Sequence, residues 1–320
     1  MRPDLDDGGR LVGYVNHRQP NNWGRWGPDD EIGTLNFITP AMVSAAEALV
    51  RAGRAVSCAI PIQEVMPVNP ARPPVVHTFM YTGTDFASLG AVEDFNGFQG
   101  SDDHIAMPLQ SSTHWDGLAH VSHDGAMYNG FWVGNVAAYS GARRCGIHLL
   151  KDRLAGRGVL LDIAWHLGVD RLAPGYAITV EELEDCATAQ GIEIGTGDIL
   201  LVRTGEMPYF YGLSDKAEFW RAGSPGLATE TVGWIHRREI AALATDNIAV
   251  EVVPRRPYEG SYPMHAMLIR DLGLTIGELW WLEDLAAACA EVNCWEFFLV
   301  AAPLPVSNGA GSPINPIAFL

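Results

Sequence analysis

Residues 159–163, Val-Leu-Leu-Asp-Ile, and residues 199–202, Ile-Leu-Leu-Val, are short, almost continuously apolar runs. Runs of this length and composition are typical of strands that are buried on both faces of a sheet. Residues 248–252 and 297–301 have the same character, and the four runs are spread over the C-terminal half of the chain. The sequence therefore predicts a sheet of buried strands as the centre of the fold.

Helical patterns lie between and before these runs. Residues 40–53 follow a threonine cap, begin with proline and stop at glycine. Residues 180–191 follow a Thr-x-x-Glu capping box, and residues 282–291 form a third Ala-rich helical pattern. Strands interspersed with helices predict a mixed α/β domain with a sheet covered on at least one face. With no repeat or long linker, residues 1–320 are expected to form a single domain, with 66–74 as a surface loop.

The charge balance narrows the range of partners. Asp and Glu number 38 against 21 Lys and Arg, which gives a formal net charge of -17. A nucleic acid or an anionic membrane surface needs clustered basic residues, so we expect neither as a partner. The sequence has no signal-like or membrane-spanning apolar run, which favours a cytoplasmic protein. The five scattered cysteines form no C-x-x-C pair and are expected to be buried, reduced thiols.

Residues 110–125 concentrate the residues that carry chemistry. The segment reads Gln-Ser-Ser-Thr-His-Trp-Asp-Gly-Leu-Ala-His-Val-Ser-His-Asp-Gly. In extended backbone, His114 and Asp116 point to the same face, where an imidazole and a carboxylate can bind one cation. His120 reaches the same pocket if the chain turns at Gly117. Imidazole and carboxylate together suit zinc, manganese or iron better than magnesium, and the absence of cysteine argues against a closed structural zinc site.

A second candidate cluster lies far downstream. His265 precedes a short apolar segment, and Glu278 follows a strand-like stretch at residues 273–276, so that the two side chains can meet across a short connection. Taken singly, such a histidine is more often a core or cap residue and such a glutamate a surface charge.

At these two clusters the chain resembles the metal-dependent cyclase family, which includes bacterial kynurenine formamidases, isatin hydrolase and cyclases of polyketide gene clusters. Residues 110–120 are similar to its His-x-x-x-His-x-Asp-x-x-x-His signature. Segments 21–36, 157–162, 198–205 and 311–316 resemble its larger members, so the likeness covers nearly the whole chain.

The resemblance implies a fold and a set of roles. The fold would be a mixed-sheet α/β/β swivelling domain, usually in a homodimer or larger homo-oligomer. His114 and Asp116 would be metal ligands, and His120 the acid/base group. His265 and Glu278 match the downstream positions that complete the metal site in formamidase-like members.

Two further residues of the motif, Gln110 and Trp115, have more than one interpretation. Gln110 stands where the signature begins with histidine, and its amide is a weaker ligand than imidazole. It is expected to bind the metal, bind the substrate or hold water, and a single zinc or manganese ion is favoured over two ions. Trp115 either walls a substrate pocket or packs in the core on the face opposite the ligands.

The expected reaction is hydrolysis of a small amide, lactam, lactone or similar carbonyl compound by activated water, with His120 moving the proton. Two alternatives stay open. A polyketide-type cyclase would use the same metal to stabilise an enolate without adding water, and a catalytically silent homologue would only bind. Segments 67–74 and 207–225 are predicted to be pocket-lining loops.

Overall fold

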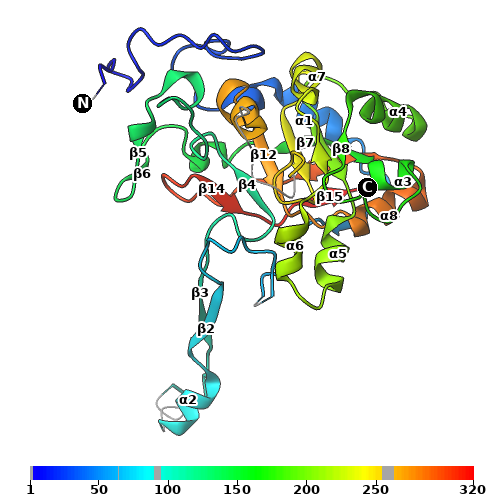
Figure 1. Cartoon of the computed structure of the whole chain (residues 1–320). Coiled ribbons are helices and arrows are strands. Elements are labelled where there is room, and N and C mark those ends of the chain that lie inside the picture. Colours follow the sequence, from blue (N-terminus) through cyan, green and yellow to red (C-terminus); the bar gives the residue numbers. More distant parts are fainter. Residues whose placement is uncertain (1–2, 64, 90–94, 254–262) are drawn as a thin grey trace.

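The computed structural model describes residues 3–63, 65–89, 95–253 and 263–320 (Figure 1). Within these residues, nine strands form one mixed sheet in the order β1-β15-β13-β7-β9-β11-β12-β4-β14. Strands β7, β9, β11 and β12 are parallel to one another, and antiparallel strands extend the sheet at both ends. The mixed α/β class expected from the sequence is confirmed. The sheet strands are β1 (Ala55–Ser57), β4 (His114–Asp116), β7 (Ala155–Asp162), β9 (Ile199–Arg203), β11 (Ala242–Thr245), β12 (Thr275–Glu278), β13 (Glu296–Val300), β14 (Gly311–Pro313) and β15 (Ile317–Phe319).

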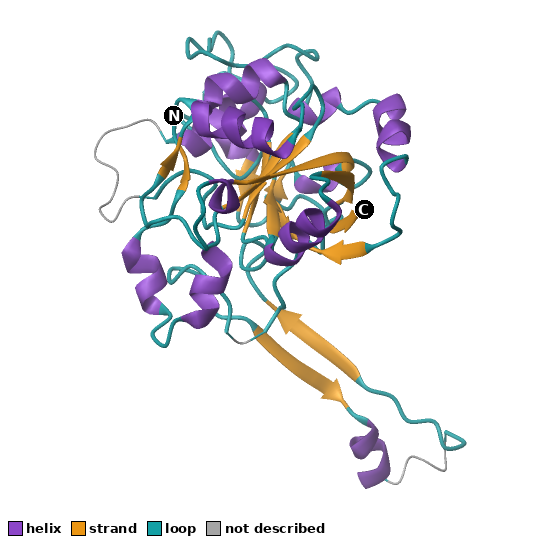
Figure 2. Cartoon of the chain, turned by 90° about the vertical axis from the view of Figure 1, so that its right-hand side faces the viewer, coloured by secondary structure: helices purple, strands orange, loops and turns teal. Residues whose placement is uncertain are grey.

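Three pairs of short or peripheral strands stand outside this sheet within the described residues. They are β2 (Val76–Tyr81) with β3 (Asp102–Ala106), β5 (Val136–Ala137) with β6 (Gly141–Ala142), and β8 (Ala177–Ile178) with β10 (Gly226–Leu227). The first pair, with a short helix at its far end, extends away from the body (Figures 1 and 2).

Helices and helical turns pack around the sheet (Figure 2). The α-helices are α1 (Pro40–Glu47), α2 (Gly83–Ser88), α3 (Ile163–His166), α4 (Val180–Gln190), α5 (Glu206–Gly212), α6 (Ala217–Ala222), α7 (Thr231–Arg238) and α8 (Glu283–Val292). The 3-10 turns are η1 (Gly33–Phe37), η2 (Tyr128–Gly130), η3 (Val133–Asn135) and η4 (Ile147–Leu150), and η5 (Ala266–Asp271) is a π-helical turn. Among the described residues, no helix combines the length and the apolar character needed to cross a bilayer.

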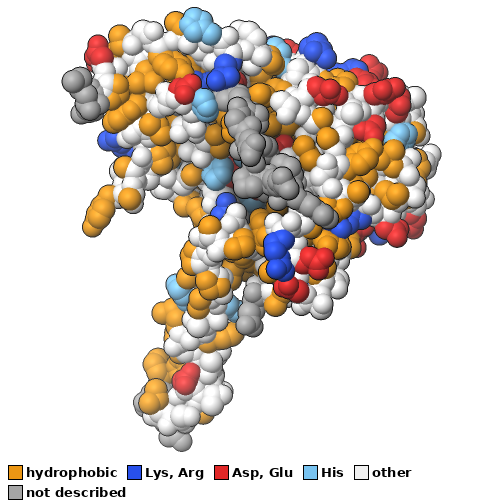
Figure 3. Space-filling model, in the orientation of Figure 1, with side chains coloured by type: hydrophobic (Ala, Val, Ile, Leu, Met, Phe, Trp, Pro, Cys, Tyr) orange, Lys and Arg blue, Asp and Glu red, His pale blue; other side chains and the backbone are white. Residues whose placement is uncertain are grey.

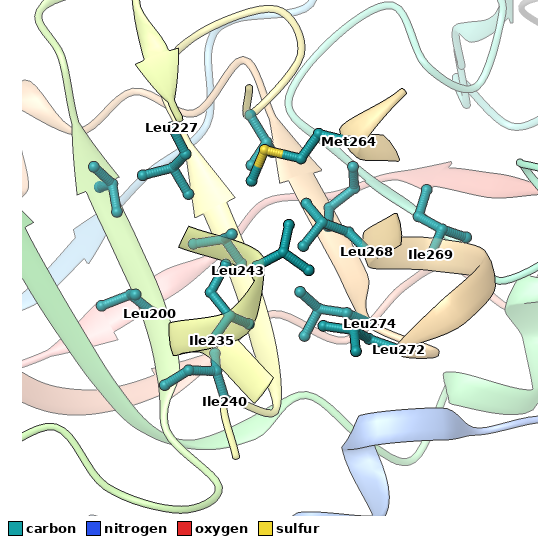
Figure 4. Close-up of a cluster of buried hydrophobic side chains, with 14 of the residues drawn as sticks. Leu200, Leu227, Ile235, Ile240, Leu243, Met264, Leu268, Ile269, Leu272 and Leu274 are labelled. Carbon is teal, nitrogen blue, oxygen red and sulfur yellow. The ribbon is translucent and has the colours of Figure 1, made fainter. Parts of the chain in front are cut away.

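The alternation of side chains along the central strands divides the core in two. Leu200 and Leu243 point to the face that is covered by α3, α4, α7 and η5. Figure 4 shows the part of this packing that involves Ile235 of α7 and Leu268 and Ile269 of η5. Leu201 and Ala244 point to the opposite face, where α8 and the antiparallel strand β13 complete a second core. Both faces of the parallel strands are therefore buried, which explains why their sequences are continuously apolar.

Most of the predicted elements are confirmed, with small shifts at their ends. Helix α1 begins at Pro40 with Thr39 as its cap, but it ends at Glu47 instead of running to Gly53. Helix α4 has the predicted capping box and ends at Gly191 in the left-handed conformation. Strands β7, β9 and β13 and helix α8 match their predicted segments to within a few residues.

Two predictions about local structure are wrong. Residues 248–252 form no regular strand, because the Asn247 side chain accepts a hydrogen bond from the Val250 amide (2.7 Å) and bends the chain after β11. The segment 207–225 is largely helical, in α5 and α6, and its Phe210 and Phe219 are buried in a third apolar cluster. Segment 66–74 has no helix or strand, as predicted.

Candidate metal centre

The candidate site is built on strand β4, which lies between β12 and β14 in antiparallel register. His114 is the direct cross-strand neighbour of Glu278 on β12, and Asp116 lies two residues further along the same face of β4. Side chains directly opposite each other in an antiparallel pair share a face and lie close together. The register therefore brings residues from distant parts of the chain to one point on the sheet.

His114, Asp116 and Glu278 offer ligand atoms that lie within 4.8 Å of one another, and all three residues are buried. Nε2 of His114 is 3.6 Å from Oδ1 of Asp116 and 3.4 Å from Oε2 of Glu278. Bonds of about 2.1 Å to a tetrahedral ion place its ligand atoms roughly 3.4 Å apart. The spacing of the three side chains fits that requirement.

The hydrogen bond of His114 orients its imidazole ring to bind a cation. Its Nδ1 lies 2.7 Å from the carbonyl oxygen of Ser112, the arrangement in which Nδ1–H donates and the lone pair of Nε2 faces the site. Nε2 of His114 and Oδ1 of Asp116 are both buried without a hydrogen-bond partner. Buried polar atoms are seldom left unpaired, so these two atoms indicate a ligand between them.

The electrostatics of the cluster also favour a positive charge. Burial by itself lowers the pKa of His114, but the carboxylates of Glu278 and Asp116 outweigh burial and raise that pKa above its ordinary value. Burial by itself raises the pKa of Glu278, but the close approach and positive charge of the His114 and His265 imidazoles outweigh burial and lower that pKa. The two buried carboxylates thus favour the protonated, positively charged form of the imidazoles beside them. A bound divalent cation would supply the same positive charge to balance the carboxylates.

His265 approaches the cluster from the start of the π-helical turn η5. Its Nε2 is 3.1 Å from Oε1 of Glu278, and its Nδ1 contacts the carboxylate of Glu251. Glu251 is itself 5% exposed, so it holds His265 from a buried position. Glu251 was not among the site residues predicted from the sequence, although a carboxylate inside the apolar run 248–252 was a signal for it.

His120 lies at the edge of the cluster. The chain turns at Gly117, which is the condition under which His120 was expected to reach the pocket, and the amide of His120 donates to the Gly117 carbonyl (2.9 Å). Nε2 of His120 is 3.6 Å from Oδ2 of Asp116, and its side chain is 27% exposed. His120 therefore both contacts the cluster and is accessible to solvent.

Gln110 lies on the same face of β4 as Asp116. Gly311 is the cross-strand neighbour of Asp116, and its lack of a side chain leaves space for the Gln110 side chain. A Cβ at position 311 would lie 2.5 Å from Nε2 of Gln110 and 2.8 Å from the backbone oxygen of Trp115, and the backbone contact disfavours any residue other than glycine there. The backbone carbonyl of Gln110 also accepts a hydrogen bond from Arg72. The Gln110 amide thus lies on the ligand-bearing side of β4.

Trp115 does not line the site, and the interpretation of it as a substrate-binding wall is corrected. Its side chain is wholly buried on the face opposite His114 and Asp116, where it packs edge to face against Trp280. Its indole N–H donates to the carbonyl of Ala301 (2.7 Å). The alternation of side chains along β4 forces this orientation.

Comparisons with known proteins bear on the family and the fold of the chain. The model of the Cyclase family, described as "Putative cyclase", matches residues 56–252. A crystal structure of a novel cyclase is 42% identical, with a TM-score of 0.89, and the match covers 94% of this chain and 99% of that one. An isatin hydrolase bound to the product analogue thioisatinate has the same fold, with a TM-score of 0.61 at 20% identity over 88% of this chain and 99% of that one.

A curated relative adds a match in sequence. The isatin hydrolase of Roseibium aggregatum is 26% identical over 152 residues, which is 46% of this chain and 54% of the relative. The chain thus spans about half the length of the curated protein that it matches.

Proposed function

Because the chain belongs to the cyclase family, we propose that it is a metal-dependent hydrolase that directs water at the carbonyl group of a small amide, lactam, lactone or similar substrate. The observation that carries the proposal is the buried trio of His114, Asp116 and Glu278. Two of its candidate ligand atoms, Nε2 of His114 and Oδ1 of Asp116, have no hydrogen-bond partner. The relative from Roseibium aggregatum is an isatin hydrolase, which supports hydrolysis as the reaction type.

The three side chains of the trio would hold one divalent ion, zinc or manganese, and Gln110 and His265 are further candidates for its coordination. When bound, such an ion lowers the pKa of water and polarises a carbonyl oxygen. The mixed imidazole and carboxylate set leaves room for water and substrate, as in catalytic sites.

His120 would move the proton. Its imidazole would take a proton from the attacking water and return it to the leaving nitrogen or oxygen, because one ring nitrogen can both accept and donate a proton. Asp116 lies 3.6 Å from Nε2 of His120 and would keep the ring turned toward the site. The partial exposure of His120 lets it reach a substrate that enters from solvent.

A second candidate reaction is favoured by the 42% identical protein, which is described as a cyclase. In a ring closure, His120 would remove a proton next to a carbonyl group, and no water would enter the product. Assays in oxygen-18 water separate the two reactions. Label in the product supports hydrolysis, and an unlabelled product of the substrate's own mass supports cyclisation.

The first test is elemental analysis by mass spectrometry of protein purified without added metal or chelator. We expect near-stoichiometric zinc or manganese in the wild type and in His17→Ala, which removes an exposed histidine outside the site. The His114→Ala/Asp116→Ala double variant should contain none. Absence of metal from the wild type after reconstitution would refute the mechanism and favour a silent binding homologue.

A further inference from the structure

Arg270 is a charged side chain that the proposed mechanism does not use. Figure 3 shows Lys and Arg side chains at separate points on the surface of the molecule, but Arg270 is buried, with 1% of its surface exposed. Burial of a charge is unfavourable unless the charge is paired and hydrogen-bonded. The Arg270 guanidinium is paired with the carboxylate of Asp271, and it donates to the carbonyl of Ala126 (3.2 Å) and to the hydroxyl of Tyr14 (2.7 Å). These partners compensate for burial of the charge and fix the position of the side chain.

The N-terminal segment also binds the backbone at and just after Arg270. Four successive carbonyl groups, those of residues 270–273, accept hydrogen bonds from it, and Figure 1 shows this segment in blue beside the orange turn η5. The donors are the indole N–H of Trp23 to Arg270 (2.6 Å), the backbone amide of Asn22 to Asp271 (2.9 Å), the side-chain amide of Asn22 to Leu272 (2.9 Å) and the backbone amide of Thr34 to Gly273 (2.9 Å). In addition, the side-chain amide of Asn16 donates to the carboxylate of Asp271 (2.9 Å). We call Tyr14, Asn16, Asn22, Trp23 and Thr34 the N-terminal clasp.

The residues held by the clasp connect two residues of the candidate site. His265 lies at the start of η5, which ends at Asp271, and β12, which carries Glu278, begins at Thr275. The carbonyl groups at the end of a helical turn have no partner within the turn. The clasp supplies these partners, so it fixes how η5 leads into β12. The position of His265 relative to Glu278 therefore depends on contacts with the N-terminal segment.

Arg270 also joins η5 to the loop that follows the motif. The carbonyl of Ala126 accepts a hydrogen bond from Arg270 and a second one from the backbone amide of His123 (2.9 Å). His123 follows His120 by three residues. The guanidinium of Arg270 thus contacts the N-terminal segment on one side and the end of the motif loop on the other.

We propose that Arg270 and the N-terminal clasp are positioning residues of the metal centre, which hold His265 where it can share an ion with Glu278. The proposal rests on the proposed function, because it gives His265 a part in metal binding. Nε2 of His265 lies 3.1 Å from Oε1 of Glu278, close to the separation of two ligands on one ion. π-helical turns are rare and often occur at functional sites, which agrees with η5 as the element that presents His265.

Trp23→Phe tests the clasp with little change in packing. The variant keeps an aromatic ring beside the guanidinium, whose Cζ lies 4.8 Å from the centroid of the Trp23 ring, and it removes the donor to the carbonyl of Arg270. Trp26→Phe is the matched control, because Trp26 lies in the same segment and packs edge to face on Phe37, outside the clasp. In chelator competition, Trp23→Phe should bind zinc or manganese about tenfold more weakly than the wild type, at the lower end of the effect of groups that orient a metal ligand. Trp26→Phe should bind as tightly as the wild type.

A double-mutant cycle with His265→Ala separates positioning from a general loss of stability. If the clasp acts through His265, Trp23→Phe should weaken metal binding in the wild-type background and have no effect in the His265→Ala background. An equal loss of affinity in both backgrounds, or no loss in either, would overturn the proposal.

Metal-free protein provides a readout that does not depend on the proposed function. The Cε1–H nuclear magnetic resonance signal of His265, assigned by its absence from His265→Ala or His265→Asn, should shift in Trp23→Phe at constant pH and stay in place in Trp26→Phe. A wild type that binds no metal refutes the proposed function, and this comparison then decides whether the clasp positions His265. An unshifted signal in Trp23→Phe contradicts the positioning role whether or not the wild type binds metal.

Discussion

Substitution of Gly277 by alanine tests the packing beneath the candidate site. A Cβ at position 277 would lie 2.6 Å from Nε1 of Trp280, 2.8 Å from Cζ3 of Trp115 and 2.9 Å from Cβ of Ala244. The two indoles pack edge to face in a dense core with centroids 5.0 Å apart, so neither can withdraw freely. Overpacking of this kind costs about 1–3 kcal/mol, and we expect the free energy of unfolding to fall by that amount.

Urea denaturation measures this change, and Gly212→Ala is the matched control. A Cβ at position 212 meets nothing within 4 Å and needs no unusual backbone angle, so this variant should match the wild type or exceed its stability by up to about 1 kcal/mol. Gly277 precedes Glu278, so we also expect Gly277→Ala to weaken metal binding. Wild-type stability and wild-type metal affinity in Gly277→Ala would together refute the packing of β4 against β12.

Three further predictions concern the site and its surroundings. His120→Ala should keep its metal in elemental analysis, but its kcat in turnover assays should fall about a hundred- to ten-thousand-fold. Asp116→Ala should lose both the metal and the turnover. Metal loss from His120→Ala would reverse the roles assigned to the two residues. Glu251→Gln should weaken metal affinity about 10- to 100-fold in chelator competition, because Glu251 orients His265, and unchanged affinity would exclude that role. Burial raises the pKa of Glu206 to about 7, above its ordinary value. The contribution of Glu206 to the free energy of unfolding is therefore most favourable at low pH and declines as the pH rises toward 7. Urea titrations from pH 5 to 8 should therefore give Glu206→Gln a stability that falls less with rising pH than that of the wild type, and identical slopes would contradict this.

The local patterns of the sequence predicted strands β7, β9 and β13 and one half of the candidate site, but they did not predict the central strand β11. The continuous apolar runs of β7 and β9 reflect burial on both faces, and the alternation in His-x-Asp places two ligand candidates on one side of β4. Both signals arise from neighbours in sequence, so they can be read without knowledge of the fold.

The remaining features depend on contacts between distant segments. The strand order, and with it the pairing of His114 with Glu278, follows from long-range registers that no local pattern encodes. Hydrogen bonds to the Asn247 side chain bend the apolar, β-branched run that follows it, so the run is not a strand. The contact of Glu251 with His265 depends on this bend and could not be predicted from the run itself. Trp115 was ambiguous because its neighbours in sequence do not reveal which face of β4 is lined by the core.

The pairing of β4 with β12 also constrains when the site can form during synthesis. Glu278 comes 164 positions after His114, and β12 and β14, the strands that pair with the two edges of β4, both follow β4 in the sequence. Closing such long loops makes folding slow, and the nascent chain exposes β4 unpaired until both strands have been made. Metal capture would therefore mark the completion of folding, and a chain truncated before β12 would have no metal with which to begin catalysis.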